Sequence, residues 1–402
     1  METRKVVKIT IFTALTLIYG TCMSIASSLF IYIQFLKNGS SVSLKTININ
    51  NQTITINKTY KSKEKQKQFL VTRINISGKI NSIIINGKKY VLPKTINFTK
   101  NSSQAIFITV NNKKLYVENQ QLLNINKKVL FTIPSLKTIG VIDKNTGLIA
   151  GFIGTQNTPT GIAVNNNKIF VGYKNTSVIS VLSLENGFHI SDIPIPGDGT
   201  CRIENSKNKL FILSSDKKRL IIYNISAGIT NSIIFPRKIS DFFVNNATDT
   251  ILTVDGDTGN IDMFSMTNGN RIGTVIIPGS IISVCGDEKN IYAADDFSKT
   301  IVKYSLISRT SDVEELINRP LKIRNFNNLI FTVTYSHLIA FDTFSLNPYA
   351  TFNIKGISEL IFTGDKIFVF SKSGKYFVID ASSFYTETVG DIPEAVLEGT
   401  YN

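Results

Sequence analysis

The chain has 402 residues, a formal net charge of +15, no Trp and only two His. The positive charge is N-terminal, because residues 1–140 carry 21 basic and three acidic side chains, whereas residues 141–402 carry 23 basic and 26 acidic ones. A nucleic-acid-binding protein needs a basic folded domain with interleaved aromatic residues, which this distribution lacks. The composition therefore excludes nucleic acid as a partner.

Residues 1–8 form a short basic tail, and the 28 residues after it, 9–36, are uncharged. A transmembrane helix needs about 20 apolar residues, and positive charges ahead of the run favour a cytoplasmic N-terminus. We therefore predict a single-span signal anchor at 9–36, with the rest of the chain outside the membrane. A cleavable signal peptide, cut after Ala26, is the alternative, because Ser24 and Ala26 are small residues at a suitable spacing.

Residues 37–118 are basic and rich in Asn-x-Ser/Thr sequons, the acceptors of N-linked glycans. Their densest charge run, Lys58–Lys67, is typical of a solvated linker. We therefore predict a glycosylated, β-rich stalk, with a degenerate extra blade built from the hairpins at 82–92 and 105–117 as the alternative. The sequons of the whole chain are Asn38, Asn51, Asn57, Asn75, Asn97, Asn101, Asn175, Asn224 and Asn246.

From residue 126 onward the sequence repeats every 37 to 41 residues, without gaps inside the units. One unit reads NNKIFVGYKNTSVISVLSLENG at 166–187, in which two runs of β-branched and aromatic residues flank a turn. Two further short strands lie between successive units, so each repeat contains four. The seven units occupy 126–147, 166–187, 207–228, 248–269, 288–309, 326–347 and 363–384.

Four short strands every ~40 residues are typical of one blade of a β-propeller. A single four-stranded sheet cannot bury both of its faces, whereas blades stacked in a ring bury each sheet against its neighbours. We therefore predict an all-β fold, a seven-bladed β-propeller at 119–395 with a C-terminal tail at 396–402. Eight blades are the alternative if the upstream hairpins complete another one.

Three stretches of one repeat, Pro159–Val164, Lys168–Val171 and Val178–Leu182, together resemble the YVTN-type β-propeller repeat, and Gly140–Phe152 is similar to it. That family is common among archaeal and bacterial surface-layer and secreted proteins. The resemblance covers residues 119–395 and implies the propeller fold. It implies no particular function, because propellers host many functions.

The sequence contains none of the motifs of hydrolase elbows, zinc proteases, redox dithiols or phosphate loops. His189 and His337 each stand alone in a strand-like segment, so we predict no catalytic residue, no metal site and no cofactor. Asp255–Asp262 carries oxygen ligands suited to calcium, but it falls at a hairpin turn of the repeat, and the turn is our prediction. Cys201 and Cys285 lie in blades two apart, beyond disulfide reach, and are predicted to be buried free thiols.

Basic side chains recur in and around the loops that join one blade to the next. In propellers these loops surround the mouth of the central channel, and guanidinium groups that converge there favour carboxylates, sulfates or phosphates. Charges paired with Asp198 and Asp241 are the alternative. The candidate ligand-binding residues are Arg202, Arg237, Lys238, Arg319, Lys322 and Arg324.

A rigid propeller with variable loops suits binding. The sequence therefore predicts a membrane-anchored, extracellular and non-enzymatic glycoprotein that acts in recognition or adhesion at a plasma membrane or on a virion envelope. Its predicted partners are the membrane, through one span, and a protein or an acidic glycan. A propeller enzyme of the lyase, lactonase or dehydrogenase type and a structural component of a surface lattice are the alternatives.

Overall fold

A computed structural model of the chain describes residues 27–35, 41–50, 52–61, 67–76, 78–98, 103–111, 114–119, 128–155, 157–185, 187 and 189–392. The predicted tails at 1–8 and 396–402 lie outside these residues. The strands of the N-terminal region are β1 (Ser27–Phe35), β2 (Ser41–Ile49), β3 (Gln52–Lys61), β4 (Lys67–Ile76), β5 (Gly78–Ile85), β6 (Lys88–Phe98), β7 (Ser103–Asn111) and β8 (Lys114–Asn119).

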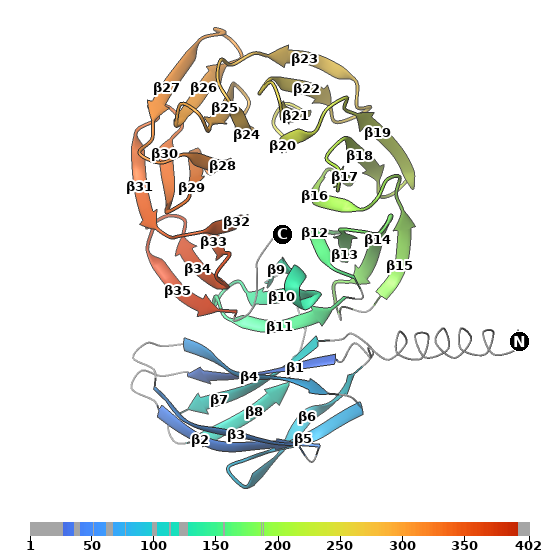
Figure 1. Cartoon of the computed structure of the whole chain (residues 1–402), viewed down its shortest axis with the longest axis vertical. Helices are drawn as coiled ribbons and strands as arrows, with labels where there is room; N and C mark the ends of the chain where they lie inside the picture. The colour runs from blue at the N-terminus through green and yellow to red at the C-terminus, as the bar shows by residue number, and fades with distance from the viewer. Residues whose placement is uncertain are drawn as a thin grey trace, which may run out of the picture.

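These eight strands form two sheets of four, in the orders β4-β1-β7-β8 and β3-β2-β5-β6. The sheets lie beside the ring formed by the rest of the chain and contact each other through β6 and β8 (Figure 1). Successive side chains of a strand point to opposite faces of its sheet, and the apolar side chains on one face are buried, as expected for sheets with one buried face. The buried members include Leu44, Ile47, Ile80, Ile83 and Ile85.

The apolar run after residue 26 is a strand and not the end of a membrane helix. Strand β1 pairs antiparallel with β4 on one side and parallel with β7 on the other, and Ile31 is fully buried. Residues 27–35 of the predicted span at 9–36 therefore lie in a strand of this sheet and not in a helix. Residues 9–26, with the alternative cleavage position after Ala26, lie outside the described residues. In the part of the chain that the structure describes, no helix has the length and hydrophobicity to cross a membrane.

Ile31→Asp is therefore expected to unfold the two N-terminal sheets, because a carboxylate without a partner in a buried site costs several kcal/mol. Limited trypsin digestion of the full-length protein should then cut within residues 37–118 while the ring stays intact. Ile31→Val is the matched control and is expected to keep wild-type resistance. Wild-type resistance of the Asp variant would show that β1 does not lie in this sheet.

The predicted stalk at 37–118 is folded. Strands β3 and β4 contain both ends of the Lys58–Lys67 run, of which only 62–66 lies outside the described residues. The upstream strands also do not form an eighth blade within the ring, because their two sheets lie beside it, where β7 contacts β11 and β4 contacts β35 (Figure 1). Asn119, the predicted first residue of the propeller, is the last residue of β8.

The remaining strands form seven antiparallel sheets around a common centre (Figure 1). Six sheets have four strands in chain order from the centre outward, and the first has three among the described residues, in the order β11-β10-β9. The prediction of an all-β ring of repeated blades is confirmed, and each repeat unit supplies two adjacent strands of one blade. The elements are β9 (Lys128–Ile133), the 3-10 helix η2 (Pro134–Leu136), β10 (Thr138–Asp143), β11 (Ile149–Gly154), β12 (Pro159–Asn165), β13 (Lys168–Tyr173), β14 (Val178–Ser183), β15 (His189–Pro194), β16 (Thr200–Ser206), β17 (Lys209–Ser214), β18 (Arg219–Asn224), β19 (Ile229–Ile234), β20 (Ile239–Asn245), β21 (Thr250–Asp255), β22 (Ile261–Ser265), β23 (Arg271–Val275), β24 (Ile281–Gly286), β25 (Asn290–Asp295), β26 (Thr300–Ser305), β27 (Ser311–Glu315), β28 (Pro320–Phe326), β29 (Leu329–Thr334), β30 (His337–Asp342), β31 (Pro348–Asn353), β32 (Ile357–Thr363), β33 (Lys366–Ser371), β34 (Lys375–Asp380) and β35 (Thr386–Asp391).

The turns carry the residues that their backbone requires. Asn166 and Asn167, between β12 and β13, have φ angles of 44° and 61°, in the left-handed region that asparagine tolerates better than most residues. The Asp255 carboxylate accepts the backbone N–H groups of Asp257 and Thr258 at 2.9 and 2.8 Å. The stretch Asp255–Asp262 therefore forms the predicted hairpin turn, between β21 and β22.

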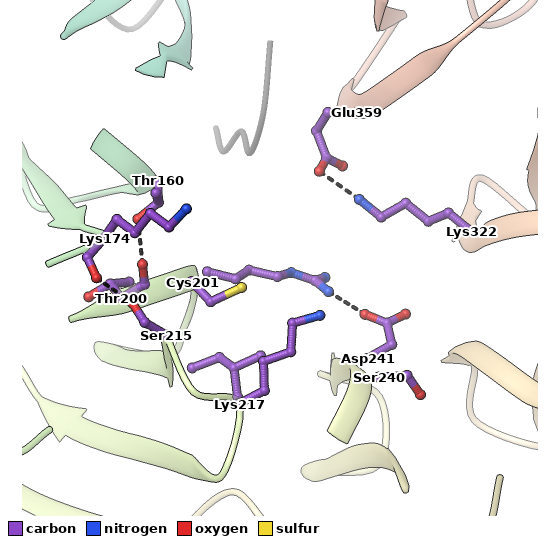
Figure 2. Close-up of a pocket in the computed structure, with 12 residues that line it drawn as sticks. Thr160, Lys174, Thr200, Cys201, Ser215, Lys217, Ser240, Asp241, Lys322 and Glu359 are labelled. Carbon is purple, nitrogen blue, oxygen red and sulfur yellow. Dashed lines mark hydrogen bonds and ion pairs between the residues drawn. The ribbon is translucent and has the colours of Figure 1, made fainter. Parts of the chain in front are cut away.

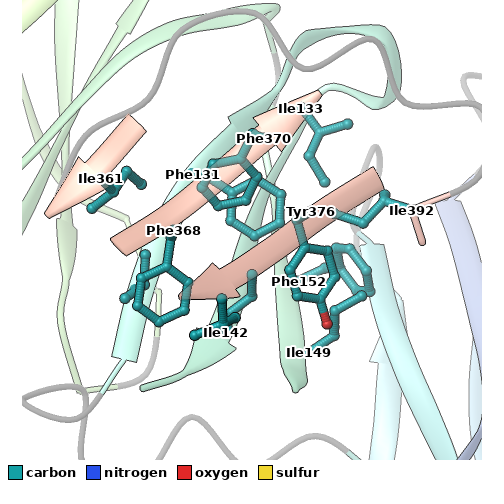
Figure 3. Packing of buried hydrophobic residues seen from close by; sticks show 12 residues of the cluster. Phe131, Ile133, Ile142, Ile149, Phe152, Ile361, Phe368, Phe370, Tyr376 and Ile392 are labelled. Carbon is teal, nitrogen blue, oxygen red and sulfur yellow. The ribbon is translucent and has the colours of Figure 1, made fainter. Parts of the chain in front are cut away.

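A buried aromatic cluster joins the first and last blades (Figure 3). The rings of Phe131 in β9 and Phe370 in β33 have centroids 4.7 Å apart. The Phe131 ring lies directly on Gly140 of β10, where an added Cβ would come within 2.1 Å of the ring. Because these blades come from opposite ends of the repeat array, their packing holds the ring closed.

Candidate functional site

Charged side chains from the innermost strands of four blades meet at the centre of the ring. Equivalent positions of successive innermost strands lie next to each other around that centre, so residues about 40 positions apart become neighbours. We call these residues the central network: Arg202 and Glu204 of β16, Asp241 of β20, Lys322 and Arg324 of β28, and Glu359 of β32, together with Ser283 of β24.

Asp241 lies between the two arginines of the central network and is 7% exposed. Arg324 Nη1 and Nη2 donate to its two carboxylate oxygens at 2.9 and 3.2 Å, and Arg202 Nη1 donates to Oδ1. Ser283 Oγ also donates to this carboxylate. Burial by itself would raise the pKa of Asp241, but the attraction of Arg324 and Arg202 outweighs burial and holds that pKa well below its usual range.

The other charges of the central network are also paired. Arg202 Nη2 donates to Glu204, and Lys322 Nζ donates to Glu359 Oε2 at 2.6 Å. Burial lowers the pKa of Lys322, and the negative charge of Glu359 opposes that effect. The three cations and three carboxylates of the central network balance, so the network connects blades without contributing net charge.

Arg202, Lys322 and Arg324 thus lie together as predicted, but in ion pairs rather than in exposed loops. Their side chains are 11%, 20% and 10% exposed, because the innermost strands turn them toward the centre of the ring. The alternative of pairing with Asp241 is the arrangement that the structure shows for the two arginines.

The other three predicted binding residues lie apart from the central network, in the loops before β20 and β28. The Arg237 side chain is 53% exposed, with Nε 3.7 Å from Asp257 Oδ2, and Lys238 is exposed next to it. The Arg319 side chain is 64% exposed, with Nη1 4.0 Å from Asp296 Oδ2. None of the three lines the pocket that lies beside the central network.

A pocket of about 370 Å³ lies beside the central network (Figure 2). Two of its lining residues, Lys174 and Lys217, were not predicted. They lie in turns in the middle of their repeat units, whereas the prediction rested on residues between units. The lining residues are Thr160, Lys174, Thr200, Cys201, Arg202, Leu213, Ser215, Lys217, Ser240, Asp241, Lys322 and Glu359.

Lys174 and Lys217 come from equivalent turns of adjacent blades, after β13 and β17. Ser215 Oγ donates to the Lys174 carbonyl at 2.6 Å, which connects the two turns. Both side chains extend from the wall into the open part of the view (Figure 2). Within the described residues neither ammonium group forms an ion pair. The two lysines therefore give the pocket an excess of positive charge.

Neither of the two histidines lines the pocket, whereas one of the two described cysteines does. His189 Nε2 lies 3.0 Å from Asp192 Oδ1 on the outermost strand of its blade, and His337 Nδ1 lies 2.7 Å from Ser336 Oγ; neither histidine lines the pocket. Cys201 and Cys285 are free thiols, as predicted. Cys285 is buried as predicted, whereas Cys201 is partly exposed and lines the pocket.

The sequons fall in both parts of the protein. Asn175 and Asn246 are exposed, and Asn224 is half-buried. Asn57, Asn75 and Asn97 fall on the N-terminal strands β3, β4 and β6. Asn38, Asn51 and Asn101 lie outside the described residues.

No protein-family model matches the chain, and no curated protein matches it. Among solved structures, the chain is similar to the computationally designed Ika8 protein, with 12% identity and a TM-score of 0.52, covering 70% of this chain and 93% of that one. It is also similar to BamB from Moraxella catarrhalis, with 13% identity and a TM-score of 0.47, covering 69% of this chain and 90% of that one. Likeness at such identity concerns the fold alone, and membership of the YVTN-type family stays a prediction. The comparisons and the blade topology show a β-propeller fold with four-stranded antiparallel blades.

Proposed function

We propose that this protein is a membrane-anchored, non-enzymatic recognition propeller, displayed on the outer side of a cell or on an enveloped virion, that binds an acidic partner at the pocket end of the ring. The exposed sequons Asn175 and Asn246 support display in a glycosylating compartment. The closed ring of blades supports a binding role, because it holds turns from distant repeats in one rigid surface.

The excess positive charge of the pocket is the observation that carries this proposal. The central network is balanced, whereas Lys174 and Lys217 add two cations to a concave site, and walls of low dielectric strengthen their potential toward an incoming anion. The lining hydroxyls support binding rather than catalysis. Thr160 and Ser215 donate to the backbone carbonyls of Thr200 and Lys174, and not to a base that would activate them.

The test is an array of neutral and acidic glycans probed with full-length protein in mild detergent. We expect binding to acidic glycans that weakens as salt rises from 50 to 300 mM, since screening shortens the reach of the two charges, the Debye length being about 10 Å at 0.1 M. Lys174→Glu combined with Lys217→Glu is expected to abolish this binding.

The matched control is Lys168→Glu combined with Lys289→Glu, which makes the same change in net charge. Both lysines are exposed next to turns between the first and second strands of their blades, at the other end of the ring. Full binding by this control is expected. Equal loss of binding in both double variants, or no bound acidic glycan, would refute the proposal.

A further inference from the structure

We propose that the pocket holds a compact ligand about the size of a monosaccharide, carrying one oxyanion group (sulfate, phosphate or carboxylate) between Lys174 and Lys217 and hydroxyl groups toward the rest of the pocket. This inference rests on the proposed function and adds the chemical class of the ligand. It limits recognition to an anionic unit that enters the pocket.

The charge distribution fixes the orientation of this ligand. Lys174 and Lys217 lie on the wall built by the second and third blades, whereas Lys322 and Glu359, on the wall built by β28 and β32, neutralise each other at 2.6 Å. An oxyanion is attracted to the first wall. At the second wall it would approach the Glu359 carboxylate, which is buried and paired with Lys322.

The size and chemistry of the pocket favour a hydroxyl-bearing ligand. A volume of about 370 Å³ lies at the small end of the range for ligand pockets, about 300–1,000 Å³. Leu213 and Cys201 supply apolar surface, while Thr160 and Ser215 supply hydroxyl groups.

Cys201 provides a reporter for occupancy because its thiol lines the pocket, whereas Cys285 is fully buried and burial raises its pKa. The experiment measures alkylation of full-length protein by iodoacetamide, read on the Cys201 peptide by mass spectrometry. Glucose 6-sulfate is the probe and glucose is its neutral match. We expect glucose 6-sulfate at millimolar concentration to slow Cys201 alkylation saturably, and glucose to leave the rate unchanged.

Lys174→Gln combined with Lys217→Gln is expected to weaken the protecting effect about tenfold or more, because two charge-assisted contacts are lost. Lys168→Gln combined with Lys289→Gln should keep full protection. Isothermal titration of glucose 6-sulfate into the same three proteins, the wild type and the two double variants, serves as a second measurement that does not need a reactive thiol. Heat of binding in the wild type and its loss in the Lys174/Lys217 variant are expected.

Absence of both protection and binding heat, or equal effects in both double variants, would overturn the inference. Acidic glycans that bind through Lys174 and Lys217 without any effect of glucose 6-sulfate would leave the proposed function standing and exclude a compact ligand. Protection by glucose 6-sulfate with no bound glycan on the array would support the pocket ligand and refute recognition of surface glycans.

Discussion

Asp241→Asn is expected to lower the free energy of unfolding of the propeller by about 3–5 kcal/mol, the usual cost of removing one partner of a buried ion pair. The substitution preserves the shape of the side chain but removes the charge that Arg202 and Arg324 share. Urea denaturation followed by circular dichroism measures the change. A loss below about 1 kcal/mol would show that the central network does not stabilise the ring.

Asp249→Asn is the matched control for this prediction. Asp249 pairs with Lys207, but the two side chains are 58% and 57% exposed, so water screens the pair. Exposed ion pairs contribute about 0–1 kcal/mol, and the control is therefore expected to remain within that range of the wild type.

The carboxylate of Asp241 also predicts that the stability of the propeller depends on pH. The pKa of Asp241 is lowered in the folded protein, so the unfolded chain takes up a proton first as the pH falls. Its stabilising effect is therefore complete above the unfolded pKa of about 3.9 and is lost progressively below it. Between pH 4 and pH 2 the free energy of unfolding of the wild type is expected to fall more steeply than that of Asp241→Asn, by up to about 1.4 kcal/mol per pH unit. Parallel curves in that window would contradict the assignment.

Phe131→Ala is expected to destabilise the ring by about 3–5 kcal/mol, as large-to-small substitutions of buried aromatic residues do. The ring of Phe131 is fully buried between the first and last blades and fills the space above Gly140, so its removal opens a cavity at the closure of the propeller. Differential scanning calorimetry of the full-length protein should show a lower transition temperature for the propeller.

Phe297→Ala is the control, because Phe297 is 79% exposed in the turn after β25 and its removal leaves no cavity. A change within about 0.5 kcal/mol is expected there. If Phe131→Ala changed stability as little as Phe297→Ala, the aromatic cluster would not be what holds the first and last blades together.

The N-terminal region shows where hydrophobicity alone is ambiguous. The run 27–35 is apolar and uncharged, which suits both a membrane helix and a strand buried inside a sheet. Its pairing partners β4 and β7 begin 40 and 76 residues after Ser27, so no local pattern identifies them. The basic run around Lys61 shows a similar limit, since charge density indicates exposure but does not exclude an exposed strand.

The candidate site shows a second limit. The positions of Arg202, Lys322 and Arg324 near the centre of the ring followed from the repeat. Their state of pairing did not, because Arg324 and Asp241 are 83 residues apart. Lys174 and Lys217 were missed because each is an ordinary turn lysine in its own repeat. They become a pair only when adjacent blades bring equivalent turns together.

By itself, the sequence determined the repeat, its four short strands per blade, the turn at Asp255 and the all-β class, because alternation of side chains and turn chemistry act over a few residues. The tertiary structure alone decided that β1 lies inside a sheet, that the central charges neutralise one another and that two lysines share one pocket. These features depend on which distant strands become neighbours. Ring closure sets those contacts through the packing of whole blades, and local sequence patterns do not encode them.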